Sequence, residues 1–151
     1  MEEETIALKD AEFMSAKQKR IVLKQWERFV ENRFSFKDFT KVLYSHLSLH
    51  CQFIAHFDRA GFYGTYFDAP EDTMRFLHQF DSDFGFESIE YGMTVWITNN
   101  AEYGDVNTAM CQILNTYKTD LYAELSAKIR TNDIARATVL LERHGLSVCP
   151  P

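Results

Sequence analysis

The sequence predicts an all-α protein, a single compact domain of five to seven helices. Apolar residues recur at helical spacing along most of the chain. Glycine and proline number only 6 and 3 in 151 residues, which disfavours an all-β sandwich with its many turns. Residues 86–98 alternate partly like a strand, but no second strand is present to pair with them, so a helix is favoured there too.

Composition sets the class of protein. The apolar fraction of 46% and the charged fraction of 25% exclude a disordered chain, and the length fits one domain over residues 1–151. Residues 1–14 and 146–151 are expected to be loosely ordered. The acidic N-terminal residues lack the apolar core of a secretory signal, and no apolar run reaches the length that spans a bilayer. A cytoplasmic protein is therefore predicted.

The first helix is predicted from residue 16 to about Asn32. Ser15 and Gln18 have the spacing of a capping box, and Asn32 is a suitable C-terminal stop. One face of this helix is apolar. It carries Val22, Trp26, Phe29 and Val30.

A second helix is predicted over residues 36–57, with Ser35 as its cap. We expect it to be central in the fold, because it is apolar around most of its circumference. Its one polar stripe consists of Lys41, Ser45, Ser48, Gln52 and His56.

The rest of the chain divides into a loop and further helices. Residues 58–69 contain two glycines among aromatic residues and are predicted to be a loop. Pro70 is typical of a first helical turn, so a helix is predicted from there to about Phe80, followed by a turn over 81–85. A long helix is predicted over 103–130, and a last one restarts at 131–133 and ends at Gly145.

His46 and His50 are the most unusual pair in the sequence. They are four residues apart on a helix, so both rings could bind one divalent metal ion. A helical wheel places His50 in the middle of the buried face and His46 on its flank. The sequence contains no ExxH or HExxH motif to supply further ligands, although His78 or an acidic residue is a candidate. The alternative is a pair of hydrogen-bonded core histidines.

The cysteines are odd in number and widely spaced, which indicates free thiols in a reducing compartment. They are Cys51, Cys111 and Cys149. Cys51 follows His50 directly, so on a helix the two side chains diverge by about 100°. This geometry disfavours a thiolate–imidazole pair and favours a buried structural thiol.

Aromatic side chains gather in and near the predicted loop. Either they anchor the loop on the core, or they line a ligand pocket or a protein interface. These residues are Tyr44, Phe62, Tyr63, Tyr66 and Phe67.

The net charge is −6, but basic and acidic residues are concentrated in separate segments of the sequence, called here the basic band and the acidic band. Residues 15–41 sum to +5 and residues 68–105 to −8. The two bands either face each other or form separate solvated faces. A basic stripe on the first helix could also contact nucleic acid phosphates, although the negative net charge opposes this. The stripe consists of Lys17, Arg20, Lys24 and Arg28.

Three functional hypotheses follow. The first is a non-enzymatic protein-interaction or regulatory domain that self-associates as a homo-oligomer, favoured because no complete catalytic set is visible. The second is a metal-binding protein or metal-dependent enzyme centred on His46 and His50. The third is an accessory nucleic-acid binder that uses the basic helix over 17–28.

Overall fold

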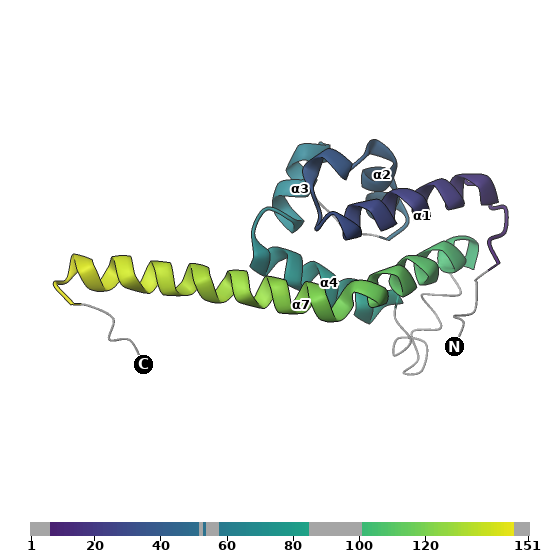
Figure 1. The fold of residues 1–151 in the computed structure, drawn as a ribbon. Coiled ribbons are helices and arrows are strands. Elements are labelled where there is room, and N and C mark those ends of the chain that lie inside the picture. Colours follow the sequence, from purple (N-terminus) through teal and green to yellow (C-terminus); the bar gives the residue numbers. More distant parts are fainter. Residues whose placement is uncertain (1–6, 52, 54–57, 85–100, 147–151) are drawn as a thin grey trace.

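A computed structural model describes residues 7–51, 53, 58–84 and 101–146. Within these ranges the protein is all-α, as predicted, with five α-helices, one 3₁₀ helix and no strand (Figure 1). The elements are α1 (Ala16–Glu31), η1 (Phe36–Asp38), α2 (Lys41–Leu49), α3 (Arg59–Tyr66), α4 (Pro70–Phe84) and α7 (Ala101–Arg143). None of the described helices is both long enough and apolar enough to cross a membrane.

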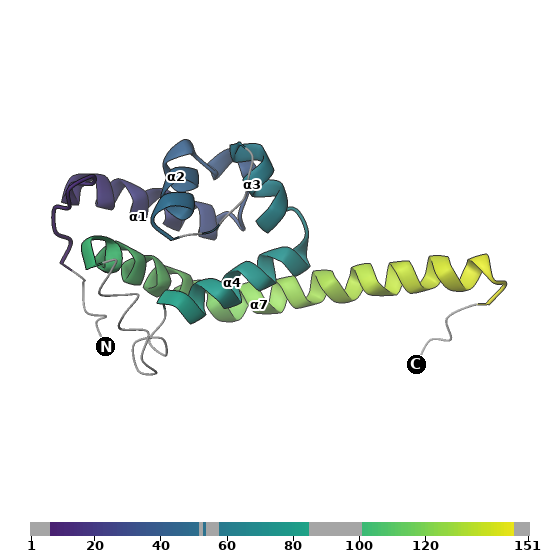
Figure 2. The ribbon, with the colours of Figure 1, turned by 180° about the vertical axis from the view of Figure 1, so that it is seen from behind.

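The helices form two layers. α4 and the first half of α7 pack side by side, and α1, α2 and α3 lie across them (Figures 1 and 2). α1 contacts both α2 and α7, so it joins the layers. The C-terminal half of α7 projects beyond the rest of the molecule as a single helix (Figure 2).

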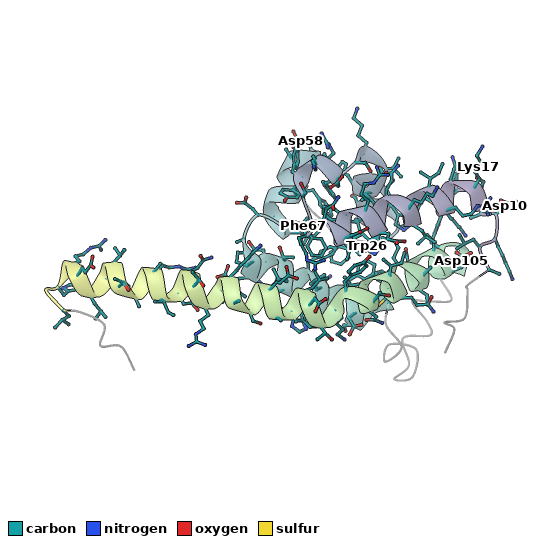
Figure 3. The ribbon with its side chains drawn as sticks, in the orientation of Figure 1. Asp10, Lys17, Trp26, Asp58, Phe67 and Asp105 are labelled. Carbon is teal, nitrogen blue, oxygen red and sulfur yellow. The ribbon has the colours of Figure 1, made fainter. Side chains whose placement is uncertain are left out.

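The core between the layers is aromatic. Trp26 is fully buried, its ring stacks on Phe80 at 5.2 Å between centroids, and its indole N–H donates to the carbonyl of Met110 at 2.9 Å. Phe67, at the end of α3, packs edge-on against Phe29. Figure 3 shows Trp26 and Phe67 directed into the interior, where they tie α1 and α3 to the α4–α7 layer.

Several local signals of the sequence are confirmed. Ser15 and Gln18 form the reciprocal capping box, and Asn32 is the C-cap of α1. α4 begins at Pro70. Gly145 adopts a left-handed φ of +72°, and the N–H of Leu146 donates to the carbonyl of Leu141, which closes the end of α7.

The predicted helix over 36–57 is wrong in its bounds. η1 covers Phe36–Asp38, and a separate helix, α2, starts after Thr40, whose side chain accepts from the N–H of Leu43. Ser35 makes no capping bond through its side chain. The break lets the fully buried Phe39 turn into the core between the two elements. α2 ends at Leu49, and Gln52 and His56 lie outside the described residues.

The predicted loop over 58–69 is also wrong, because it contains α3. Asp58 caps this helix by accepting from the N–H of Gly61. Burial of Phe62 gives the helix a core contact that offsets the low helical propensity of its glycines. The turn predicted over 81–85 is likewise helical up to Phe84, which is buried at the end of α4.

The restart predicted at 131–133 is absent, and α7 is one continuous helix of 43 residues. Between Gly104 and Gly145 the sequence has no proline and no glycine, so nothing interrupts the backbone hydrogen bonds. Residues 86–98, whose conformation was ambiguous, lie outside the described residues, as does Cys149.

Candidate functional site

A buried polar cluster joins α2 to α7. His46 is 1% exposed, and its Nε2 lies 2.7 Å from Oδ1 of Asn107, a fully buried residue of α7. The amide nitrogen of Asn107 donates to the carbonyl of His50 at 3.1 Å. Asn107 therefore binds both the side chain of His46 and the backbone at the C-terminal end of α2.

These contacts define the proton positions on His46. Asn107 donates through its nitrogen to a carbonyl, so its oxygen must be the acceptor. Nε2 of His46 then carries the hydrogen and donates to that oxygen. Nδ1 of the neutral ring is consequently an acceptor, and this atom is buried without a hydrogen-bond partner among the described residues.

Burial also determines the charge of the two histidines. It lowers the pKa of His46 from 6.5 to about 4, against the opposing effect of the Asn107 hydrogen bond. Burial lowers the pKa of His50 as well. Both rings are therefore neutral at physiological pH.

The wheel ranked the two histidines in the wrong order. His46 is the buried one, whereas His50 is half-buried and stacks on the ring of Tyr103 at 3.9 Å between centroids. The difference arises from position along the helix: His46 lies inside α2 and contacts Asn107 of α7, whereas His50 is the C-cap at the end of α2. For the same reason Leu49, expected on the apolar surface of a central helix, is 69% exposed.

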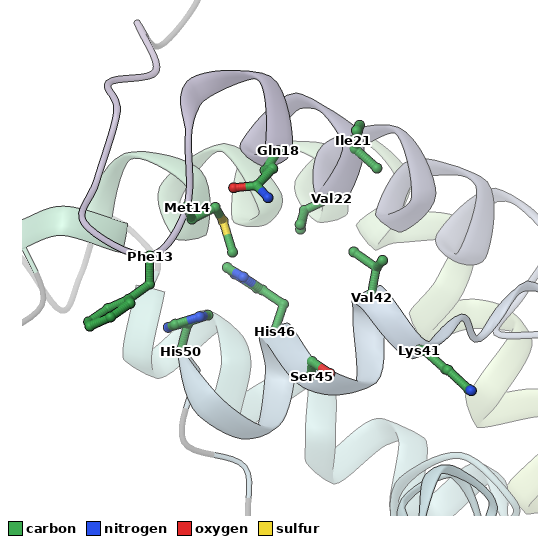
Figure 4. A pocket seen from close by; sticks show the side chains of 10 residues that line it. All are labelled: Phe13, Met14, Gln18, Ile21, Val22, Lys41, Val42, Ser45, His46 and His50. Carbon is green, nitrogen blue, oxygen red and sulfur yellow. The ribbon is translucent and has the colours of Figure 1, made fainter.

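A groove of about 410 Å³ runs between the segment before α1, α1 itself and α2, and His46 and His50 lie in it (Figure 4). Among the described residues, its walls are mostly apolar and contain no acidic side chain. The lining residues are Phe13, Met14, Gln18, Ile21, Val22, Lys41, Val42, Ser45, His46 and His50. Three of the apolar ones are well exposed: Phe13 at 75%, Ile21 at 41% and Val42 at 41%.

The donor set for a metal at His46 and His50 is incomplete in the described part of the chain. The ring centroids are 5.2 Å apart, but Nε2 of His46 is already engaged by Asn107. No three His, Cys, Asp or Glu side chains converge anywhere among the described residues. His78 stacks on Tyr122, on the α4–α7 layer. Metal binding stays a prediction.

The described cysteines are buried thiols, as expected for Cys51. The Sγ of Cys51 donates to Oδ1 of Asn107 at 3.4 Å, and burial raises its pKa well above the usual value. Burial raises the pKa of Cys111 to about 12. Neither thiol is ionised at neutral pH, so neither is an activated nucleophile.

The aromatic residues singled out from the sequence lie around α3 and away from the groove lining. Phe62 and Phe67 are core residues, and the hydroxyl of Tyr63 donates to the carbonyl of Phe34 at 2.6 Å. Tyr44 and Tyr66 both pack against Phe62. These contacts support the interpretation that the aromatic residues anchor this segment on the core.

The basic stripe lies on the outer face of α1. Its four residues, Lys17, Arg20, Lys24 and Arg28, are all exposed, and none forms an ion pair with a described residue. Figure 3 shows Lys17 directed away from the body.

Lys19, which lies outside the predicted stripe, is instead 1% exposed and pairs with Asp105 at 2.8 Å. It lies three residues before Val22, on the apolar stripe, and this spacing could have identified it.

Three residues of the acidic band, Glu71, Asp81 and Asp105, pair with basic residues outside it. Asp81 pairs with Lys118, and Glu71 pairs with Arg136, both across the α4–α7 layer. Only the Lys19–Asp105 pair links the basic band to the acidic band in the described residues. The stripe on α1 is therefore a separate solvated face, next to the groove.

Comparison with known proteins finds no relative. No protein-family model matches the chain, and neither a curated protein nor a solved structure resembles it significantly. The function must therefore be inferred from the chain's own residues.

Proposed function

We propose that this protein is an interaction domain that binds an acidic amphipathic helix of another protein in the groove between α1 and α2. The observation that carries the proposal is an exposed apolar groove bordered by basic side chains that form no ion pair with a described residue. An amphipathic helix that lays its apolar face in such a groove is a recurring mode of recognition.

The apolar part of the site supports the docking of a helix face. Phe13, Ile21 and Val42 come from three different segments and face one groove, so their exposed surface is contiguous. A contiguous exposed apolar patch with a polar border is typical of a protein interaction site.

Charge supports an acidic partner. Lys17 and Lys24 lie four residues before and three after Ile21, so they share its helix face. Lys41 lines the groove from the opposite side. Because no described acidic side chain lines the groove, a partner rich in Asp and Glu gains attraction on both borders.

The described surfaces of a second copy fit the groove poorly. The acidic helix α4 already buries its apolar face in the core. The projecting half of α7 has exposed apolar residues but carries Lys128, Arg130, Arg136 and Arg143 against only Asp133 and Glu142. Its charge matches that of the groove border, so a different protein is the better occupant. Self-association stays a prediction.

Fluorescence anisotropy with a designed amphipathic helical peptide tests the proposal. The peptide has leucines on one face and glutamates on the other, and a second peptide has lysine at every glutamate position. We expect the glutamate peptide to bind the wild type, with an affinity that falls as the salt concentration rises. Its affinity for V42D should be at least about tenfold lower, because a carboxylate is then buried against the apolar face of the peptide. The lysine peptide is expected not to bind.

The matched control is I134D, which places the same charge on an apolar residue of similar exposure outside the groove. It should bind the glutamate peptide like the wild type. Equal binding of both peptides, equal loss in both variants, or no binding at all would overturn the proposal.

Two other outcomes would point to the other hypotheses. Retention of a nonspecific DNA duplex at low salt, lost when the four stripe residues are changed to Gln, would favour nucleic-acid binding. A rise in melting temperature with Zn²⁺ in the wild type, absent in H50A, would favour metal binding.

A further inference from the structure

We infer that the partner helix inserts an aromatic side chain that carries an N–H or O–H group, with tryptophan as the best fit, and that this group donates to Nδ1 of His46. The inference rests on the proposed function, because it names the anchor that the groove accepts. Its basis is the one buried acceptor atom on a groove-lining side chain that lacks a partner in the described residues.

The chemical requirement follows from the tautomer. Nε2 of His46 donates to Asn107, whose own nitrogen is held by the carbonyl of His50. Nδ1 is therefore the acceptor of the ring, and a ligand must approach it with a donor. A carboxylate, an ether or a purely apolar group cannot satisfy this atom.

The burial of His46 makes the requirement strong. The ring is 1% exposed, so Nδ1 has lost its hydrogen bonds to water and has gained none from the described residues. A buried acceptor without a partner is costly, and any occupant that satisfies it recovers that cost. The gain adds selectivity as well as affinity, because an anchor without a donor leaves the atom unsatisfied.

The surroundings of His46 select an aromatic body for the donor. Met14, Val22 and Val42 line the same groove, and its volume of about 410 Å³ accommodates an indole. Figure 4 shows the side chain of Met14 pointing toward the ring of His46. Met14 is unbranched and half-buried, so it can turn aside and rest its sulfur on the incoming ring. Tryptophan combines a large apolar surface with one N–H and no acceptor.

A double-mutant cycle tests this contact. The glutamate peptide is made with a central Trp or with benzothienylalanine, which replaces the indole N–H by sulfur and keeps the shape. We expect the Trp peptide to bind the wild type about two- to tenfold more tightly. In H46L no acceptor atom remains on this side chain, so the two peptides should bind alike. In the control H50Q the preference for Trp should remain.

A spectroscopic readout is independent of any variant. Long-range ¹H–¹⁵N spectra should show Nδ1 of His46 as the unprotonated nitrogen, and free indole, but not benzothiophene, should shift its resonance. If H46L does not fold, this shift and the peptide preference of the wild type decide the question. Equal binding of the two peptides to the wild type, or an unshifted Nδ1, overturns the inference alone. If neither peptide binds, the proposed function fails with it.

Discussion

The two halves of α7 have the same secondary structure and opposite surroundings. From Tyr103 to Leu125 the helix places an apolar stripe against α1 and α4, and Val106, Met110 and Leu114 are buried there. Residues 126–146 form an arm in which no side chain is buried, although Ile134, Val139 and Leu140 are each more than half exposed. Figure 1 shows the arm projecting past the other helices.

The difference shows that helix formation and packing are separate properties of this chain. Backbone hydrogen bonds and the absence of proline and glycine suffice to continue the helix. Packing needs an apolar stripe that stays on one face, and beyond Leu125 the apolar residues point in several directions around the helix. The arm is therefore helical without contributing to the core.

The largest expected effect lies in the body. Trp26→Ala should lower the free energy of unfolding by about 3–5 kcal/mol, because it leaves a cavity in the aromatic core and removes the bond to Met110. Ile134→Ala in the arm should change it by less than about 0.5 kcal/mol. Urea unfolding followed by far-UV circular dichroism, which does not depend on Trp26 as a probe, measures the free energy of unfolding of both variants. Similar losses of stability in the two variants would mean that the arm is packed in solution.

Proline substitutions sharpen the same comparison at two exposed positions of α7. Thr119→Pro breaks the helix where it lies against the body and should cost about 3 kcal/mol or more. Ala137→Pro interrupts only the arm, so the helical signal should fall while the unfolding midpoint stays within error. A large drop in the midpoint for Ala137→Pro would contradict the separation of arm and body.

Acid should weaken the body through His46. The folded state holds this ring neutral down to a pKa of about 4, whereas the unfolded chain protonates it near 6.5. The unfolded state therefore binds more protons between these values, and stability falls as the pH drops from about 6.5 to 4, by about 3 kcal/mol in total. His50 has a lowered pKa and acts in the same direction. Urea unfolding at several pH values gives the free energy of unfolding as a function of pH. This free energy should fall less steeply with falling pH in His46→Gln than in the wild type.

The smallest effect is expected at the ion pair that joins arm and body. Glu71 and Arg136 lie 3.3 Å apart, but the side chains are 35% and 68% exposed. Solvent screens such a pair, so a double-mutant cycle with Glu71→Ala and Arg136→Ala should give about 0–1 kcal/mol. A larger coupling would show that the arm is fixed to α4.

Much of the fold was predictable because its signals are local. The capping box at Ser15, the start of α4 at Pro70 and the end of α7 at Gly145 depend on neighbouring residues alone. The buried face of α1 follows from the spacing of Val22, Trp26 and Phe29. The sequence also identified the histidine pair as the unusual feature of the chain.

Tertiary contacts decided the rest. The sequence could not show that Phe39 breaks the helix predicted over 36–57, because its burial depends on Phe29 and Phe62, which lie elsewhere in the chain. It could not assign roles to the histidines either, since the partner of His46 is Asn107, 61 residues away. Periodicity by itself determines which faces are apolar, but only packing decides which of those faces are covered, and the groove between α1 and α2 is an apolar surface left open.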